Sequence, residues 1–501
     1  MEYCLKIKKI KKITILCLLV AAFVLAACTA DGGTETTVET KEPAGEQAAE
    51  DLVGDDLGEA NYGGRSFTFI TGGSDFWNQL DRISVEGEIG EVINDATYKR
   101  NLAVEERFNI AIKDRQVTPD RVVPDMQKSI GAGDRTYDAG YMWGCYFIDF
   151  AASGYLYDLN NLPRVDFAKP YWDQNAKEQL SILGRLYMMT GTANMFYNDC
   201  TWVLMFNKKL LADYSLEDPY KLVREGNWTI DKMLEMGKPV AKDLNGDGNF
   251  SVEDQYGLVT HSETIKYMFY ASGENFFNKN ADGIPELSGG GNRAINVLQK
   301  VFEVFNEYNF TFDTRNPKNQ AAVAGIIGGN IDGQQAMFEP NKALFCGEQL
   351  ECVRRYREME TPFGLLPLPR YDAGQKDYYS SVSYPFSGVC VPIDVGDDAE
   401  FTGTILEAMH SASYHTIIPA YFDSALYGKF FRDEESRETL DIIYGRRSYP
   451  FDEFKDFGGL VGSLKADIIA GKANFASTIA SIEGKAKTAI EALIESLEKL
   501  N

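Results

Sequence analysis

The sequence predicts an α/β protein of two lobes, in which parallel sheets are covered by helices. The chain has 501 residues, which is more than a single hydrophobic core usually supports. Its composition, with 44% hydrophobic and 25% charged residues, is that of a soluble globular protein. From about residue 62, aromatic and β-branched runs alternate with segments of helical spacing. This alternation is typical of parallel strands joined by helices.

The first 27 residues have the organisation of an export signal. A lysine-rich start precedes an apolar run over residues 13–27, which is short for a spanning helix of roughly 20 residues. The segment 25–28 resembles a bacterial lipobox ending in Cys28. That resemblance implies cleavage after residue 27, lipidation of Cys28 and anchoring on the extracellular face of the cell membrane. The alternative is an ordinary signal peptide followed by a coincidental cysteine.

Residues 28–61 are predicted to be a flexible acidic linker, because they contain few large apolar residues. The formal net charge of the whole chain is −24, and loss of the lysine-rich signal makes the mature chain still more acidic. Such a surface repels phosphate backbones, and the sequence contains no basic stripe. Nucleic acid is therefore excluded as an expected partner.

The folded body is predicted to begin near Tyr62 with a β-α-β pattern. Its first elements, in order, are a strand at 67–71, a helix over 93–108, a strand at 110–113, a helix around 126–130, a strand at 137–142 and a short helix at 147–153. The segment after Leu460 predicts helices that pack on a lobe. In open α/β sheets, ligands bind beyond the carboxyl ends of the strands. Two loops at such positions carry tryptophan.

The cysteines and histidines give little support to catalysis or redox chemistry. The body contains an odd set of thiols with no CxxC motif, namely Cys145, Cys200, Cys346, Cys352 and Cys390. This set favours buried thiols over a disulfide framework, although Cys346 and Cys352 could close a small loop. Only three histidines are present, and no GxSxG, P-loop or HExxH motif occurs. Histidine-based, thiol-based and nucleotide-dependent catalysis therefore have little support from the sequence.

Several motifs in order carry a resemblance to a known family. They are 72–77 (GGSDFW), 137–143 (YDAGYMW), 154–159 (GYLYDL), 171–173 (YWD), 202–211 (WVLMFNKKLL), 227–234 (NWTIDKML), 364–369 (GLLPLP) and 378–392. Together these resemble the extracellular solute-binding proteins of the carbohydrate-binding family that includes the maltose-binding protein. The resemblance covers nearly the whole mature body.

The resemblance implies a periplasmic-binding-protein-like fold of type II, with two discontinuous α/β lobes joined by a hinge. Lobe 1 would comprise residues 62–200 and 380–415, and lobe 2 residues 201–379 and 416–501. Two or three neighbouring strands would cross between the lobes and permit bending. The implied function is capture of a sugar or oligosaccharide by a monomer, which delivers it to the permease subunits of an ABC transporter.

The candidate ligand-binding residues are aromatic or planar polar side chains, because a pyranose offers C–H faces for stacking and hydroxyls for paired hydrogen bonds. Trp77, beside Asp75, and Trp143 follow predicted strands. Trp202 lies in an apolar strand, where burial in the core is the expected role. The full candidate set is Asp75, Trp77, Trp143, Asp199, Tyr270, Asn341, Tyr384 and Tyr421. Each of them has a packing role as its alternative.

Residues 243–254 reproduce the spacing of a calcium-binding loop. Oxygen-bearing side chains recur at Asp243, Asn245, Asp247, Asn249 and Asp254, with glycine at the sixth position. Asp254, whose side chain is shorter, replaces the usual glutamate at position twelve. The prediction is a structural Ca²⁺ site, and the alternative is a turn without metal.

Two other functions remain open at this point. A surface carbohydrate-active enzyme would also use an aromatic cleft with carboxylates. A binding protein for a peptide or another non-sugar solute would share the fold and differ in the pocket, because fold alone does not determine the ligand.

Overall fold

Two separate β-sheets organise the body of the protein in a computed structural model that describes residues 53–73, 81–328, 332–356, 359–422 and 434–500. Val53–Asn501 forms one compact unit. The predicted export signal, the lipidated Cys28 and most of the predicted linker lie outside the described residues. The two sheets and their helices have the architecture expected of a two-lobed periplasmic-binding-protein-like fold.

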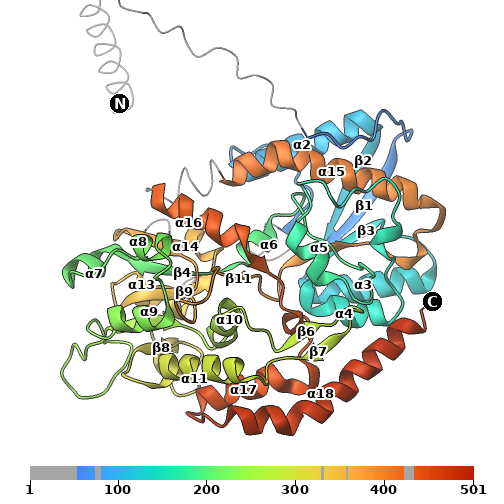
Figure 1. The fold of residues 1–501 in the computed structure, drawn as a ribbon. Coiled ribbons are helices and arrows are strands. Elements are labelled where there is room, and N and C mark those ends of the chain that lie inside the picture. The colour runs from blue at the N-terminus through green and yellow to red at the C-terminus, as the bar shows by residue number, and fades with distance from the viewer. Residues whose placement is uncertain (1–52, 74–80, 329–331, 357–358, 423–433, 501) are drawn as a thin grey trace, which may run out of the picture. The chain divides into compact units, whose positions relative to one another are not determined.

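The first sheet confirms the β-α-β pattern read from the sequence. Its strand order is β12-β3-β1-β2, with β1 at Arg65–Thr71, β2 at Ile110–Gln116, β3 at Ala139–Trp143 and β12 at Ser387–Cys390. Strand β1 runs parallel to β2 and β3, whereas β12 is antiparallel to β3. The connecting helices are α2 (Val92–Phe108), α3 (Pro119–Ala132) and α4 (Gly144–Ala152). Helix α15 (Ala399–Pro419) lies along α2 (Figure 1).

Local sequence signals set the ends of these helices. The Glu91 side chain accepts a hydrogen bond from Asn94 N and so caps α2, which ends at Asn109 in the left-handed conformation (φ 49°). Helix α3 begins with Pro119 in its first turn and ends at Gly133 with φ 68°. These caps return the chain to the sheet after each helix.

The second sheet has the order β10-β4-β9-β5-β8. Its strands are β4 (Trp202–Asn207), β5 (Tyr256–Thr260), β8 (Thr311–Asp313), β9 (Ala343–Gln349) and β10 (Phe363–Leu366). Strand β5 is parallel to β8 and β9, but β4 is antiparallel to both β9 and β10. The sequence predicted parallel sheets, and both sheets are mixed. Strands β4 and β12 closely follow points where the chain passes between the sheets, and β10 pairs with β4.

Three chain segments lie side by side between the two sheets. Strand β11 (Ser380–Ser381) pairs in parallel with β13 (Arg447–Ser448). Thr201, directly before β4, forms an isolated bridge with Val382, and Ser383 N donates a hydrogen bond of 3.0 Å to the carbonyl of Cys200. The strands divide between the sheets as the predicted lobes require. The lobe boundaries themselves stay a prediction.

The carboxyl-terminal helices α17 (Leu460–Ile469) and α18 (Phe475–Glu498) follow the predicted pattern. The buried stripe of α18 includes Ala486, Ile490, Leu493 and Leu497. Helix α18 contacts α17 and α11 (Asn292–Asn306), which the sequence assigns to lobe 2, and also α4, which it assigns to lobe 1 (Figure 1). The last helix therefore has contacts on both sides of the predicted lobe boundary.

Two further findings concern the whole described body. None of its helices combines the length and apolar character that crossing a membrane requires. All five body cysteines are free thiols, and four of them are buried, so Cys346 and Cys352 do not form a disulfide. The sequence-based preference for buried thiols is confirmed.

Candidate ligand-binding site

A cavity of about 420 Å³ lies at the carboxyl ends of β5, β8 and β9, beside the start of β4. The second sheet contributes Trp202 from β4 and Glu348 from β9, while His261 comes from the loop after β5. Tyr384 and Pro385, from the segment between β11 and β12, line the other side. Loops at the carboxyl ends of strands are the usual ligand position in α/β sheets, and the volume is in the range of small-ligand pockets.

Stacked aromatic rings form one wall of the cavity. The Trp202 ring stacks on Tyr267 from α10 (Thr264–Ala271), with a centroid distance of 4.1 Å and an interplanar angle of 19°. His261 packs edge-on against the same indole at 5.2 Å. Trp202 is 1% exposed, and its indole Nε1 has no hydrogen-bond partner among the described residues. A buried N–H without a partner is costly, so this donor calls for an acceptor on a ligand or a water molecule.

Tyr384 connects the cavity to the first lobe. Cys145 N, in α4, donates a 3.3 Å hydrogen bond to the Tyr384 carbonyl. The Tyr384 side chain is 39% exposed, and its ring lies edge-on to Trp143 with a centroid distance of 6.5 Å. Trp143 is the last residue of β3. Of the predicted ligand residues, Tyr384 lines the cavity and Trp143 lies against it, outside the lining.

Three carboxylates share one guanidinium in the opposite wall. Arg355, in α14 (Cys352–Arg355), pairs through Nη1 with Asp332, through Nε with Glu351 at 3.1 Å and through Nη2 with Glu348 at 3.6 Å. Asp332 caps α13 (Gly333–Phe338). The surrounding carboxylates raise the pKa of Arg355 against the opposing effect of burial. One positive charge thus faces three acidic groups.

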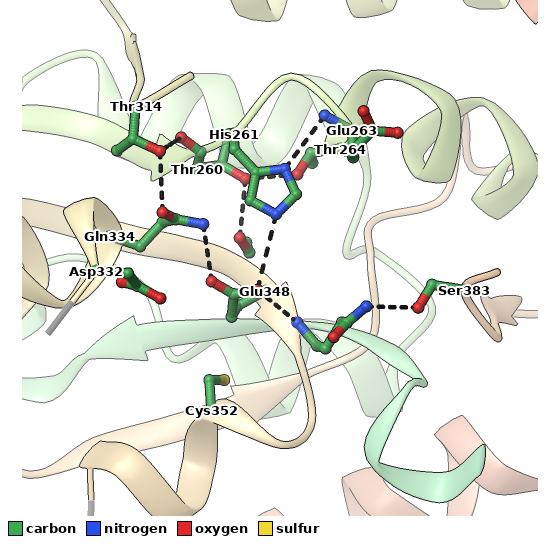
Figure 2. Close-up of polar contacts among 12 residues, drawn as sticks. Thr260, His261, Glu263, Thr264, Thr314, Asp332, Gln334, Glu348, Cys352 and Ser383 are labelled. Atoms are coloured by element: carbon green, nitrogen blue, oxygen red, sulfur yellow. Dashed lines mark hydrogen bonds and ion pairs between the residues drawn. The ribbon is translucent and has the colours of Figure 1, made fainter. Parts of the chain in front are cut away.

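Glu348 occupies the centre of this polar network, between His261 and Gln334 (Figure 2). Gln334 Nε2 donates a 2.8 Å hydrogen bond to one carboxylate oxygen, and His261 Nε2 lies 3.8 Å from the other. Burial and the neighbouring charge of Asp332 raise the pKa of Glu348 to about 7. Burial and the charge of Arg315 lower the pKa of His261 well below its ordinary value. His261 is therefore neutral and adds no positive charge to the acidic cluster around Arg355.

A separate ion cluster lies behind the aromatic wall. Lys266 Nζ is 2.7 Å from Glu453 Oε1 and 3.2 Å from Glu263 Oε2, and Lys465 also pairs with Glu263. Glu453 in addition accepts hydrogen bonds from Tyr267 Oη at 2.8 Å and Tyr384 N at 3.1 Å. Two lysines here balance two carboxylates. This cluster holds the aromatic side chains in place.

Two other predicted residues are paired with each other inside the protein. The Tyr421 hydroxyl donates a 2.8 Å hydrogen bond to Asp199, and Asp199 also forms an ion pair with Arg354. Asp199 is 2% exposed and Tyr421 1% exposed. Neither lines the cavity, because both polar groups are already satisfied within the fold.

Tyr270 and Asn341 also lie away from the cavity lining. The buried Tyr270 hydroxyl donates to Asp452, on the face of α10 that meets the segment Phe451–Glu453. Asn341 has a positive φ of 62°, and its side chain accepts a 2.7 Å hydrogen bond from Asn207 Nδ2. Asp75 and Trp77 lie outside the described residues. Ligand contact by these four residues stays a prediction.

Residues 91–343 match the family model of the bacterial extracellular solute-binding proteins, over half of the chain. The chain belongs to this family. The match runs from the cap of α2 to the start of β9 and includes Trp202, His261 and Tyr267. Membership places the chain among extracellular binding proteins rather than enzymes, as the sequence predicted.

Solved structures of similar fold support the same architecture. The chain aligns with a cyclo/maltodextrin-binding protein complexed with maltotetraose at a TM-score of 0.55 and 13% identity, covering 87% of this chain and 96% of the other. It aligns with the cyclic α-maltosyl-1,6-maltose binding protein of Arthrobacter globiformis at a TM-score of 0.54 and 13% identity, over 87% and 99%. It also aligns with UgpB of Mycobacterium tuberculosis, in complex with glycerophosphocholine, at 0.53 and 14%, over 86% and 99%. No curated protein matches the sequence.

The sequence analysis missed most of the polar residues of this solute-binding site. Glu348, Gln349 and Glu351 directly follow an apolar run at 343–347, so charge at the carboxyl end of a buried strand was a usable signal. His261 likewise follows the apolar strand β5. Trp202 was assigned to the core. It is indeed buried, but it is the first residue of its strand and also lines the cavity.

The predicted calcium loop of this solute-binding protein is held together by its own carboxylates. Asp243 accepts hydrogen bonds from Gly246 N at 2.6 Å and Gly248 N at 2.8 Å. Asp254 accepts one from Leu244 N at 2.9 Å. Across the described part of the chain, no three His, Cys, Asp or Glu side chains are grouped as metal ligands. Calcium binding at Asp243, Asn245, Asp247, Asn249 and Asp254 stays a prediction.

Proposed function

We propose that this chain is the lipid-anchored binding protein of an ABC importer and that it captures a sugar or oligosaccharide in the cavity beside Trp202. The observation that carries the proposal is the combination of stacked aromatic rings with a polar wall at the carboxyl ends of the strands. Aromatic faces suit the C–H faces of a pyranose, and the carboxylates suit its hydroxyls. Similar structures with bound maltotetraose or cycloalternan support this choice of ligand class.

Calorimetry with a panel of neutral oligosaccharides tests the proposal on the mature chain, with Cys28→Ser to keep it in solution. Trp202→Phe keeps an aromatic ring and removes the indole N–H, so we expect binding to weaken by about 3- to 10-fold, which is the effect of one hydrogen bond. Trp228→Phe is the matched control, because its Nε1 donates to the Pro367 carbonyl in the core at 3.0 Å. Equal effects of the two changes on affinity would argue against the cavity as the site.

A non-sugar solute is the competing ligand class for the same cavity. UgpB, which has a similar fold, was solved with glycerophosphocholine, so the calorimetric panel also includes glycerophosphodiesters and short peptides. Binding of one of these without binding of any sugar would replace the carbohydrate proposal.

The lipid anchor is the second part of the proposal. It rests on the apolar run before Cys28 and on the lipobox-like segment 25–28. Labelled fatty acid should be incorporated into the wild-type chain and not into Cys28→Ser. We expect the variant to appear in the medium and not in the membrane fraction. Labelled Cys28→Ser would contradict lipidation at this residue.

The lobes are proposed to close over the ligand by bending at the three adjacent segments that include Cys200, Ser381 and Ser448. Backbone pairing between these segments supports a hinge that bends without breaking the sheets. Small-angle scattering should show a smaller radius of gyration with ligand than without it. An unchanged radius would contradict closure.

We also propose that Ca²⁺ binds the loop 243–254 as a structural ion. The proposal rests on the spacing of Asp243, Asn245 and Asp247 and on the glycine at position 248. In this loop the ion would order surface backbone and take no part in ligand capture.

A further inference from the structure

The charges around the cavity are unevenly balanced. Behind the aromatic wall, Lys266 and Lys465 offset Glu263 and Glu453. In the opposite wall, Asp332, Glu348 and Glu351 share Arg355 as their charged ion-pair partner among the described residues. The lining therefore carries an excess of negative charge on one side, next to the aromatic rings.

Of the other described cations, Arg354 also favours the charged form of Glu351, but it already forms an ion pair with the buried Asp199. Arg315 also lines the cavity, but it is solvent-exposed, and it forms no ion pair within the described part of the chain. After Arg355 at 3.6 Å, His261 is the next basic side chain to Glu348, at 3.8 Å, and its burial keeps it neutral. Glu348 is 5% exposed and Glu351 9% exposed. Buried carboxylates with too few cations are unfavourable until a proton or a cation joins them.

The geometry favours an ammonium group over a metal ion as that cation. Among the described residues, no three acidic, histidine or cysteine side chains are grouped as metal ligands. An ammonium group instead offers three N–H donors, and it does not need the short, fixed distances of metal coordination. Arg355 Nη1 already donates a charged hydrogen bond of the same kind to Asp332.

The carboxylates call for a cation on the ligand, and Trp202 calls for a hydrogen-bond acceptor. It pairs with Gln349 across the β4–β9 ladder, so it stands one residue away from Glu348. Its buried Nε1 lacks an acceptor among the described residues. A ligand that satisfies both walls must present an oxygen acceptor beside the indole and a cation beside the carboxylates.

We propose that the cavity selects a sugar or oligosaccharide that carries a protonated amine, with the amine bound by Asp332, Glu348 and Glu351 and a ring or hydroxyl oxygen bound by Trp202. This inference rests on the proposed function and specifies the chemical class of its ligand. Anionic sugars such as uronates are disfavoured by the same carboxylates. N-acetylation of the amine removes its positive charge, so the acetylated sugar should lose the tighter binding of the amino sugar.

Calorimetry on the mature Cys28→Ser chain, at a pH where the amine is protonated, compares matched probes. The sugars are glucosamine, N-acetylglucosamine, glucose and glucuronate, together with chitosan and neutral glucan oligomers, and spermidine serves as an amine without a sugar ring. We expect the amino sugar to bind at least tenfold more tightly than its neutral and acetylated counterparts. Glucuronate and spermidine should bind more weakly than the amino sugar.

Two conservative variants assign the effect to the carboxylates. Glu348→Gln and Asp332→Asn should each reduce the preference for the amino sugar over its neutral counterpart to threefold or less. The Asp332→Asn chain is expected to fold even if the Glu348→Gln chain does not. Asp332 is more exposed than Glu348, and asparagine can also cap a helix. Glu235→Gln is the matched control, because Glu235 is an exposed acid on α9 (Ile230–Gly237).

The possible outcomes separate this inference from the proposed function. The inference is overturned if neutral sugars bind as tightly as amino sugars, or if uronates or spermidine bind more tightly than amino sugars. The proposed function, sugar capture, still stands if any of the sugars binds. If the preference survives both variants, the carboxylates do not receive the amine. If no sugar binds, the proposed function and the inference both fail.

Discussion

Replacement of Lys266 by methionine tests the ion cluster that holds the aromatic wall. Lys266 Nζ lies 2.7 Å from Glu453 Oε1, and the Glu453 side chain is fully buried. Burial by itself lowers the pKa of Lys266, but the charges of Glu453 and Glu263 outweigh burial and raise this pKa above its ordinary value. Lys266→Met leaves Glu453 as a buried carboxylate without a cation. Loss of one partner of a buried pair typically lowers the free energy of unfolding by about 3–5 kcal/mol.

Urea unfolding followed by tryptophan fluorescence measures this loss of stability. The free energies are compared only if the wild-type and variant chains have equal m-values. Lys232→Met is the matched control, because Lys232 pairs with Glu217 and Glu235 at the surface, and its removal should lower stability by less than about 1 kcal/mol. Lys266→Met combined with Glu453→Gln should recover at least half of the loss, since the buried charge is then removed. A Lys266→Met chain as stable as the Lys232→Met chain would refute the reasoning.

Three further predictions follow from other parts of the structure. Burial and the Asp332 charge raise the pKa of Glu348 from 4.5 to about 7. The native state then keeps a proton that the unfolded chain loses, so stability should fall by on the order of 3 kcal/mol as pH rises through this interval. Thermal unfolding across pH measures the slope, and a slope unchanged in Glu348→Gln would contradict this assignment. EDTA should lower the melting temperature if Ca²⁺ occupies the loop 243–254, and Asp243→Ala should abolish that response; an unchanged melting temperature would count against calcium. A methyl group at Gly403 would lie 1.8 Å from the Pro163 carbonyl oxygen, so Gly403→Ala should lower the free energy of unfolding by about 1–3 kcal/mol. Gly484→Ala, where α18 has open space, should raise it by about 0.5–1 kcal/mol, and the reverse order in urea unfolding would show the packing argument to be wrong.

The fold was largely predictable, because its signals are local. The alternation at 67–71 and the helical spacing over 93–108 correspond to β1 and α2 within two residues at each end. Strand direction was less predictable. β4, β10 and β12 run antiparallel to their neighbours, and that direction depends on where a strand joins the sheet after the chain passes between lobes.

The binding site was predictable only in its general position. The rule that ligands bind at the carboxyl ends of strands selected Trp143, which does lie beside Tyr384. Asp199 and Tyr421 were selected by position along the chain, yet they satisfy each other in the interior. Sequence position does not reveal which polar side chains find partners, because those partners are far apart in the chain.

The sequence by itself determined the α/β class, the order of the elements, the family resemblance and the acidic character of the chain, because each of these depends on local pattern or composition. Only the tertiary structure decided which side chains line the cavity. Trp202, His261, Glu348 and Arg355 come from four separate segments, and their charges and hydrogen bonds acquire meaning only when folding removes water and brings them within a few ångströms of one another.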